Sequence, residues 1–479
     1  MSMMLPDVAS EALDYNNIKR RAMASRSYRV RIPTSNATSF TQGQTMFLDL
    51  PSNLSGTFMD MTQTYIRFKV TYAAGAGPTK IALDKAAGYS LFQRISCITS
   101  GQQIFDLNNY NVLVSAFMDT DASNDWKGNA GNVLCGTTAA CPHGETFQIA
   151  NASTVTRTYC LPFILNPFAL QKKLIPLFSL DSLRFRITLE TATNALILNS
   201  GALAAIPYTL SDVEMVSYFT ELSPSAMAQL DSITGGVYNL LCPSYSNSQA
   251  TMTQGTTVLN SVLGIAVSSL ERIIVIHRPN DAAVAAGSTL GARFSNGLQT
   301  AQFFINSEAY PQRNVSVDDM AAEPLAEYLI SDHCLHDFSR ASCIQNFNVS
   351  AGATGLEGQN IFDSRLYNIT NINLSSGSAF SGVNNAWNNV SGTGLVQGFG
   401  NEAITTVGSF VLAIELETGC SAGRSDRLYS GISTISSVVQ YKGTYASGVA
   451  LGATLDFFAQ YTILLTLNMR QTGVWSCTI

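Results

Sequence analysis

The segment "LRFRITLETA" (183–192) alternates apolar and polar residues, which is the period of a strand with one buried face. Its apolar side comprises Leu183, Phe185, Ile187 and Leu189. Its polar side comprises Arg184, Arg186, Thr188 and Glu190. A second segment, "VLAIELETG" (411–419), contains the same Ile-x-Leu-Glu-Thr pattern. The pair raises the question of whether the chain contains one domain twice.

The same period recurs along the chain, for example in "YIRFKV" (65–70) and in "ILLTLNMR" (463–470). The segment "RIIVIH" (272–277) is continuously apolar, which is typical of a strand buried on both faces. Helical patterns are few and short. They cover 107–119, 324–330 and 224–233, where Ser223 suits the N-cap and Pro224 the first helical position. Many strands and few helices favour antiparallel sandwiches or barrels.

The order of these patterns supports a repeat. A strand pattern with a turn at Gly101 leads into a helical pattern, and a later strand pattern with a turn at Ser307 does the same. Aligning these two turns gives an offset of 206 residues, whereas aligning Ile187 with Ile414 gives 227. We interpret the difference as an insertion within 345–401, a Gly-, Ser- and Asn-rich stretch with only three charges. Chance recurrence of strand triplets is the alternative to duplication.

The composition favours a protein that forms large subunit contacts. At 479 residues the chain is longer than one hydrophobic core usually supports, so two domains are expected. Charged residues make up 13%, against about 25% in a typical soluble domain, and such a surface suits oligomerisation. The net charge of −6 gives no overall attraction to nucleic acid or anionic membranes. We expect no secretory signal, no membrane span, and nine cysteines that are free buried thiols.

Two clusters carry residue types that bind metals. Both "DHCLHD" (332–337) and "CGTTAACPHG" (135–144) lack the spacing of familiar zinc sites, so we interpret them as structural. The four histidines lie in no recognisable catalytic motif, and acid pairs such as Asp119 and Asp121 suit solvated loops better than a glycosidase. We therefore predict a protein that is not an enzyme, with no catalytic residue, metal, cofactor or small-molecule substrate.

Four segments, taken in order, carry a resemblance to a known family. They are "GTFMDMTQTYIRFKV" (56–70), "YTLSDVEMVSYFTELSPSAMAQL" (208–230), "SSLERIIVIHRP" (268–279) and "LYSGIST" (428–434). Their order and spacing resemble the double jelly-roll major capsid proteins of double-stranded DNA viruses, the lineage of giant viruses, virophages and Polinton-like viruses. The resemblance spans about residues 30–470, and no single motif in it is diagnostic.

The resemblance implies an all-β fold of two tandem eight-stranded antiparallel jelly rolls, with a few short helices and long loop insertions. The implied domains are a basic N-terminal arm at 1–31, jelly roll 1 at 32–222, a linker with a short helix at 223–236, and jelly roll 2 at 237–479. The insertions at 120–158 and 345–401 are expected to form outer towers.

The implied function is that of a major capsid protein. Such chains form pseudo-hexameric homotrimeric capsomers that tile an icosahedral shell around a double-stranded DNA genome. The expected partners are the chain itself, penton proteins and minor capsid proteins, and the expected location is the virion, assembled in the host cytoplasm or nucleus. A tandem β-sandwich carbohydrate-binding or adhesion protein, such as a fibre, is the alternative.

A basic stretch, "IKRRAMASRSYRVRI" (18–32), precedes the first strong strand pattern. Its cations are Lys19, Arg20, Arg21, Arg26, Arg29 and Arg31. We interpret it as an arm at the inner face of the shell, in contact with minor capsid proteins, a membrane or the genome. An ordinary solvated terminus is the alternative.

Overall fold

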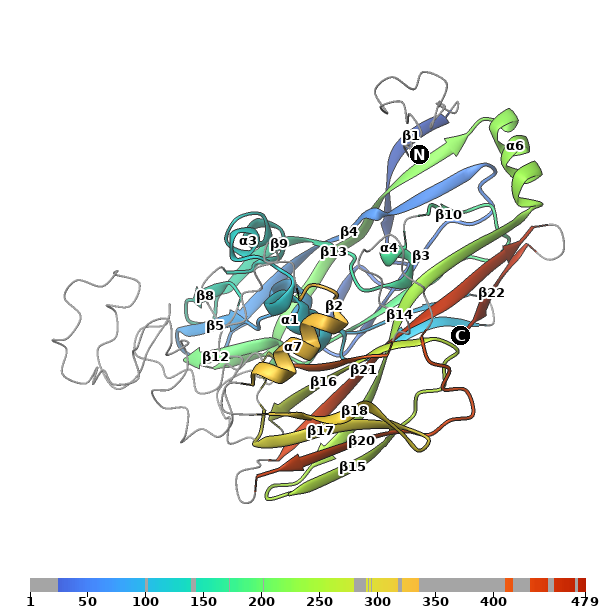
Figure 1. Ribbon diagram of the computed structural model, residues 1–479. Coiled ribbons are helices and arrows are strands. Elements are labelled where there is room, and N and C mark those ends of the chain that lie inside the picture. The colour runs from blue at the N-terminus through green and yellow to red at the C-terminus, as the bar shows by residue number, and fades with distance from the viewer. Residues whose placement is uncertain are drawn as a thin grey trace, which may run out of the picture.

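The structure is a computed structural model, and Figure 1 shows its ribbon. It describes residues 25–99, 102–138, 144–171, 173–200, 202–279, 290–291, 293, 295–317, 321–335, 410–416, 431–446, 452–469 and 473–479. These residues form two antiparallel β-sandwiches that follow each other along the chain.

The first sandwich consists of two sheets, here called sheet A and sheet B. Sheet A has the order β1 (Ser25–Pro33), β13 (Leu203–Leu222), β4 (Thr57–Ala74), β10 (Ile175–Pro176), with β2 (Ser39–Thr41) on β13 and β9 (Thr154–Pro162) on β4. Sheet B has the order β3 (Thr45–Asp49), β11 (Arg184–Leu189), β6 (Phe92–Ile98), β7 (Gln103–Leu107). The sheets enclose an apolar core in which Phe68 of sheet A and Phe92 of sheet B have ring centroids 5.4 Å apart. This strand order, with every pair antiparallel, is that of a jelly roll.

The second sandwich repeats this order in sheets D and E. Sheet D runs β14 (Val237–Met252), β21 (Ala453–Asn468), β16 (Leu270–Pro279), β19 (Leu412–Glu415), with β22 (Val474–Thr478) also on β21. Sheet E runs β15 (Val258–Leu263), β20 (Val439–Tyr445), β17 (Leu298–Ile305), β18 (Glu308–Ser316). Its core contains Tyr441 and Phe457, one from each sheet, with ring centroids 5.1 Å apart.

Short helices and a small third sheet complete the described part of the chain. The third sheet, sheet C, has the order β12 (Leu196–Ser200), β5 (Thr79–Leu83), β8 (Thr146–Ile149). The helices are η2 (Ala87–Leu91), α1 (Tyr110–Thr120), α2 (Asn124–Gly128), α3 (Ala130–Cys135), α4 (Pro167–Leu170), α5 (Ala192–Ala195), α6 (Pro224–Thr234) and α7 (Ala322–Ser331). The predicted loop at 120–158 therefore holds helices and strands, whereas 345–401 lies outside the described residues.

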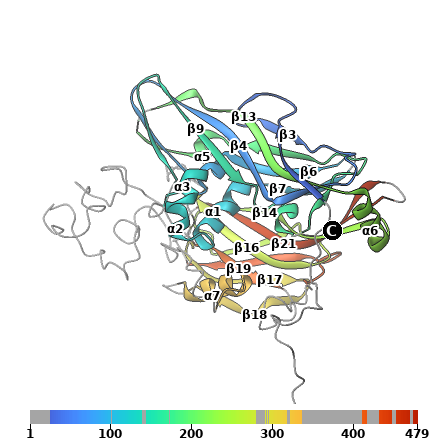
Figure 2. The same cartoon turned by 90° about the horizontal axis from the view of Figure 1, so that it is seen from above.

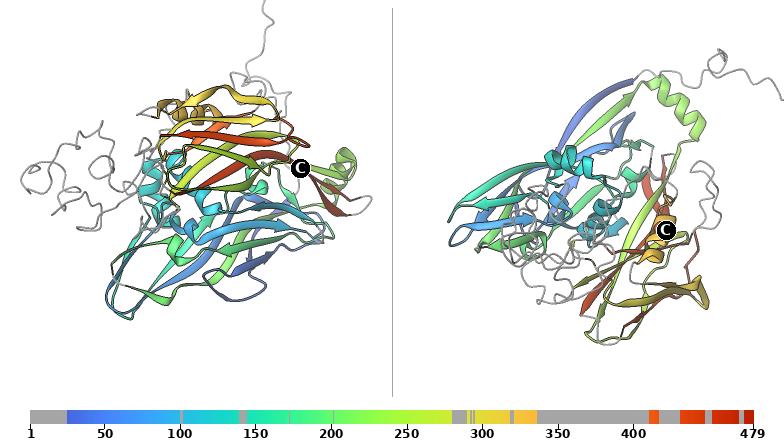
Figure 3. Two further views of the ribbon diagram at one scale, coloured as in Figure 1. Left: turned by 90° about the horizontal axis from the view of Figure 1, so that it is seen from below. Right: turned by 60° about the vertical axis from the view of Figure 1, so that its left-hand side comes forward.

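The helix α6 begins as the sequence predicts and ends one residue later, at Thr234. The Ser223 side chain accepts a hydrogen bond from the backbone N–H of Ala226, and Pro224 occupies the first turn. Gly235, with φ of 67°, ends the helix in the left-handed conformation that glycine adopts readily. Figure 3 shows α6 standing out from the body of the molecule between β13 and β14, so it joins the two jelly rolls.

One of the two sequence markers for duplication pairs equivalent strands, and the other does not. The hairpins β6–β7 and β17–β18 hold the same place in their sheets, and each precedes a helix, α1 or α7, as the first offset predicted. Ile187, however, lies on β11 in sheet B, whereas Ile414 lies on β19 in sheet D. The counterpart of β11 is β20, so the shared Ile-x-Leu-Glu-Thr pattern reflects strand chemistry, and the repeat lies in the sheet order.

The predicted facing of the first quoted strand is correct except at its end. Phe185, Ile187 and Leu189 are fully buried, while Arg186 is exposed. Glu190 was predicted to face solvent but is buried, because the strand ends at Leu189 and the chain turns into α5. Its carboxylate accepts hydrogen bonds there from the side chains of Asn111 and Asn194 and from both the backbone N–H and the hydroxyl of Thr191.

The two jelly rolls lie side by side with helices between them. Figure 2 shows α1 and α2 between the first jelly roll and strands β14, β16 and β21 of the second. The strand β16, which was predicted to be buried on both faces, is buried throughout Ile273 to His277. One of its faces belongs to the core of the second jelly roll, and the other faces the junction.

Candidate functional site

The predicted basic arm lies partly inside the fold. Lys19, Arg20 and Arg21 lie outside the described residues, whereas Arg26, Arg29 and Arg31 lie on β1. This strand pairs with β13 over its whole length, from Ser25–Leu222 to Pro33–Glu214. The predicted arm boundary at residue 31 is therefore wrong. The sequence signal for a strand is the alternation of Tyr28, Val30 and Ile32, which face inward between the arginines.

Arg29 and Arg31 of β1 are held against the outer face of sheet A. The Arg29 guanidinium donates a hydrogen bond to the Tyr218 hydroxyl at 2.6 Å and lies 5.0 Å from the centroid of that ring. This hydrogen bond raises the pKa of Arg29 above its usual range. Arg31 lies 3.3 Å from the carboxylate of Glu214, which Arg67 also contacts at 3.5 Å. Among the described residues no strand pairs with the other edge of β1, so β1 is an edge strand.

A buried ion cluster connects the two jelly rolls at the end of α1. The Asp119 carboxylate lies 3.1 Å from the Lys85 ammonium and pairs with the guanidinium of Arg293, which comes from the second jelly roll and is fully buried. Burial would raise the pKa of Asp119, but the attraction of these cations outweighs it and lowers the pKa to about 2. Burial lowers the pKa of Lys85 to about 8 against the opposing attraction of Asp119. Arg293 also donates to the Ser115 hydroxyl at 2.9 Å.

A second buried cluster surrounds Asp456 on β21. Its carboxylate, with no exposed surface, accepts hydrogen bonds from Arg278 at 2.6 Å and from the side chains of Asn109 and Gln249 at 2.8 Å each. Asn109 comes from the first jelly roll, so this cluster also spans the junction. Buried charges that lose one partner cost several kcal/mol, so both clusters fix how the two jelly rolls pair.

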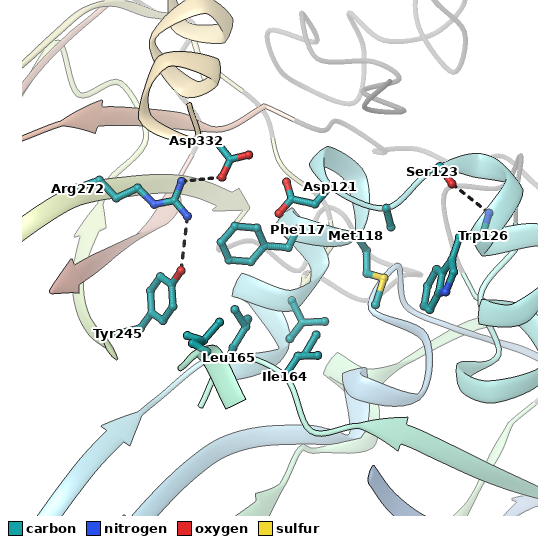
Figure 4. A pocket seen from close by; sticks show the side chains of 13 residues that line it. Phe117, Met118, Asp121, Ser123, Trp126, Ile164, Leu165, Tyr245, Arg272 and Asp332 are labelled. Atoms are coloured by element: carbon teal, nitrogen blue, oxygen red, sulfur yellow. Dashed lines mark hydrogen bonds and ion pairs between the residues drawn. The ribbon is translucent and has the colours of Figure 1, made fainter. Parts of the chain in front are cut away.

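A pocket of about 660 Å³ opens at the same junction (Figure 4). Its apolar wall comes mainly from α1 and α2 and includes Phe117, Met118 and Trp126. Its other wall comes from the second jelly roll and includes Tyr245 and Arg272. The Arg272 guanidinium lies 5.6 Å from the centroid of the Phe117 ring, so the two jelly rolls also meet through a cation–π contact.

The two predicted metal-like clusters do not converge in the described residues. Asp332 pairs with Arg272 at 3.3 Å, and His333 lies 3.4 Å from the carboxylate of Glu415, while His336 and Asp337 lie outside the described residues. In "CGTTAACPHG" only Cys135 to Thr138 and Gly144 are described. Across the part of the chain that the structure describes, no three His, Cys, Asp or Glu side chains gather as metal ligands would.

The described cysteines differ from reactive ones. Cys97, Cys135, Cys160, Cys242 and Cys477 are free thiols. Burial raises the pKa of Cys135 and Cys242 to about 12 and that of Cys477 to about 11, so these groups are protonated thiols at neutral pH. In the described residues no helix combines the length and the apolar character that a membrane span requires.

No family model matches the chain, and no curated protein matches its sequence. The structure is similar to VP54 of PBCV-1, as fitted into a reconstruction of the virophage Sputnik, with a TM-score of 0.57, 10% identity, and coverage of 97% of this chain and 99% of that chain. It is similar to the Faustovirus major capsid protein, with a TM-score of 0.55, 9% identity, and coverage of 93% and 91%. It is also similar to the mavirus major capsid protein, with a TM-score of 0.50, 10% identity, and coverage of 100% and 96%.

These likenesses and the repeated sheet order define the class: the chain is a double jelly-roll protein. Its fold is that of the major capsid proteins of Faustovirus and mavirus, over more than nine-tenths of each chain. The expected fold class is confirmed.

Sequence reasoning missed the residues of the junction. Arg293 and Asp456 were not singled out as functional, and Asp119 was interpreted as a solvated loop acid although it lies buried at the end of α1. A usable signal exists for Asp456, because it interrupts the apolar run "LDFFA" (455–459). A lone charge within a strand that is otherwise apolar indicates a buried partner elsewhere in the chain.

Proposed function

We propose that this protein is a major capsid protein. It forms pseudo-hexameric homotrimeric capsomers that tile an icosahedral shell around a double-stranded DNA genome. The carrying observation is the repeat of one sheet order in two jelly rolls that buried ion clusters join into a unit. The likeness in fold to the Faustovirus and mavirus major capsid proteins, over nearly the whole of each chain, supports this role.

The geometry suits a hexagonal lattice. A trimer of chains with two similar sandwiches presents six similar units, so it approximates a hexagon although its symmetry is three-fold. The contact between chains is heterologous and closes after three steps, and weaker contacts between trimers then extend the shell. The buried clusters contribute because a lattice unit must keep its two sandwiches in one relative orientation.

The partners in this proposal are other copies of the chain, penton proteins and minor capsid proteins. The segment before β1 contains Lys19, Arg20 and Arg21, and the edge strand β1 itself carries Arg26, Arg29 and Arg31. We propose that this basic region contacts a minor capsid protein, an internal membrane or the genome on the inner side of the shell. The role is structural and not catalytic. The protein resides in the virion and assembles in the cytoplasm or nucleus of a host cell.

The decisive experiment measures mass and shape together. Purified full-length protein should have a mass of three times the 51.4 kDa chain, and negative-stain images should contain pseudo-hexagonal capsomers or lattices of them. A monomer at micromolar concentration without any hexagonal lattice would overturn the proposal. Isolated stalks or fibres would favour the adhesion protein instead.

A further inference from the structure

The core of the second jelly roll contains a histidine, His277 on β16. The side chain is fully buried, and so are Ile273 and Val275, which face the same way along this strand. The centroid of the His277 ring lies 5.9 Å from that of Tyr445 on β20 and 6.0 Å from that of Phe410. The histidine therefore lies between sheets D and E, at a position that a sandwich core usually gives to an apolar residue.

A single hydrogen bond to a described residue holds this ring. The Nε2 atom lies 2.9 Å from the hydroxyl of Tyr445, so the bond joins sheet D to sheet E. Among the described residues the Nδ1 atom has no hydrogen-bond partner. A neutral imidazole suits this arrangement, because one of its two nitrogens carries no proton. A protonated ring carries a proton on both nitrogens, so it would leave one donor unpaired in the core.

The described groups around the histidine provide no charge that would stabilise a cation. From β20 the titratable groups are the hydroxyls of Tyr441 and Tyr445, and burial raises the pKa of both, so they stay uncharged. From β21 the paired residue is Leu455. The charged residues next to this pair in the sheet, Arg278 and Asp456, bind each other in the cluster at the junction. A proton on the ring would therefore be a buried charge without a counter-charge.

We propose that His277 is an acid-sensitive switch in the second jelly roll. The neutral ring holds sheets D and E together through Tyr445, and protonation separates the two sheets around it. The switch belongs to the single chain, so it goes beyond the proposed shell-building function and does not depend on it. In a shell of such chains the same change would loosen each unit in mildly acidic surroundings, and only this consequence rests on the proposed function.

The direction of the pH dependence follows from the burial of the ring. Burial without a counter-charge lowers the pKa of His277 from 6.5 to about 3 in the folded chain. As the pH falls, the opened state therefore binds a proton before the folded state does. The stability that the neutral ring contributes is fully present above about pH 6.5 and is lost progressively below it. Between pH 7 and pH 5 the opening constant of this region should rise by about 25-fold.

Hydrogen exchange of the purified full-length protein measures this opening. Exchange of peptides from β16 and β20 is followed by mass spectrometry at pH 7, 6 and 5, and it is corrected for the pH dependence of exchange in an unfolded chain. These peptides should show the rise of about 25-fold. Peptides from β4 and β13 of the first jelly roll should rise by about threefold or less. An equal rise in both jelly rolls would overturn the proposal, as would a rise of about threefold or less in β16 and β20.

Two variants remove the titrating group. His277→Gln keeps a side chain that can hydrogen-bond Tyr445, and His277→Phe keeps an aromatic ring, so they fail to fold for different reasons if they fail at all. In either variant the opening constant of β20 should change by about threefold or less between pH 7 and pH 5. His333→Asn is the matched control, because His333 is partly exposed and has a φ of 54° that asparagine tolerates. It should keep the acid response of the wild type. A response of wild-type size in a folded His277 variant would overturn the proposal, and if neither variant folds, the comparison of the two jelly rolls in the wild type decides.

Discussion

The first and second jelly rolls differ on the outer faces of corresponding strands. The pairs β1–β13 and β14–β21 occupy the same place in their sheets, and they begin with Ser25–Leu222 and Val237–Asn468. Four residues along from these pairs, the first jelly roll has Arg29 opposite Tyr218, and the second has Leu241 opposite Leu464. Both leucines are exposed, by 52% and 38%. One fold therefore carries a cation–π pair on its outer surface in one copy and an aliphatic pair in the other.

The side chains around these two pairs also differ in polarity. Beside Arg29, the outer face of sheet A carries Arg31, Arg67 and Glu214 in ion pairs. Beside Leu241, the outer face of sheet D carries Asn239 opposite Thr466, with Ser476 on β22 next to them, and the Lys173 ammonium donates to the Asn239 carbonyl at 3.0 Å. An ionic face tolerates water, whereas exposed aliphatic side chains gain free energy when a neighbour covers them. The outer surfaces of the two jelly rolls therefore differ at matching positions, although their interiors follow one plan.

A buried carboxylate should destabilise the interiors of the two jelly rolls to a similar extent. Ile187→Asp on β11 and Val439→Asp on β20 each place a carboxylate in a fully buried position of corresponding strands, at a cost of about 4 kcal/mol or more. Both variants should lose soluble trimer. Arg186→Gln, on the exposed side of β11, should keep wild-type yield. The yields are compared by size-exclusion chromatography. Equal yields of Ile187→Asp and Arg186→Gln would contradict the assigned facing of this strand.

Loss of a buried charge at the junction between the two jelly rolls should have the next largest effect on stability. Asp119→Asn leaves Lys85 and Arg293 buried without a carboxylate, and the free energy of unfolding should fall by about 3–5 kcal/mol. Acid has a related effect on the wild type. The pKa of Asp119 is lowered to about 2 in the folded state, so its contribution is present above pH 4 and is lost as the pH falls toward 2.

Denaturant unfolding of wild type and Asp119→Asn between pH 6 and pH 2 checks both statements. The difference between the two proteins should be largest at pH 6 and should shrink by about 2 kcal/mol toward pH 2. A difference that does not change with pH would show that Asp119 contributes through packing and not through its charge.

Residues 1–24 should be needed for shell assembly, and the residues of β1 that follow them should be needed for folding. Removal of residues 1–24 takes away Lys19, Arg20 and Arg21 but no paired strand residue, so the trimer should persist. If these cations clamp an acidic neighbour, shell formation should weaken as salt rises, because screening acts beyond about 10 Å at 0.1 M. Removal of residues 1–33 also deletes β1 and uncovers β13, so soluble protein should be lost.

Trimer yield and shell formation of both truncated chains are measured over a salt series. Loss of the trimer on removal of residues 1–24 would place that segment in the fold. Normal shells at every salt concentration would make it an ordinary solvated terminus.

The sequence predicts what local periodicity encodes and misses what depends on distant partners. Alternation alone assigned the buried sides of strands such as 65–70 and 183–189 correctly, because the interiors of the two sandwiches consist mainly of apolar residues. Basic residues concealed β1, since an edge strand with one solvated face can carry arginines, here Arg29 and Arg31, at its outward positions. The Ile-x-Leu-Glu-Thr repeat misled because strands in different sheets share the same composition. The cluster of Asp119, Lys85 and Arg293 joins residues far apart in the chain, so no local pattern reveals it.

The smallest structural change should have a selective effect on assembly. Leu241→Lys lies on the outer face of sheet D, so the stability of the single chain should change by about 0.5 kcal/mol or less. If the exposed aliphatic pair packs against a second copy in the proposed homotrimer, the new charge should raise the trimer dissociation constant about tenfold or more. Arg29→Gln, at the matching position of sheet A, should leave both quantities close to wild type.

Transplanting the pair of the first jelly roll into the second, by Leu241→Arg with Leu464→Tyr, separates the effect of side-chain shape from the effect of side-chain polarity. It recreates a pair that already suits this strand geometry, so folding should survive while the trimer weakens. Sedimentation equilibrium and thermal melting of the three variants measure the two effects. Equal trimer affinity in all of them would mean that the aliphatic pair lies outside the contact, and that the difference between the two outer faces has no role in assembly.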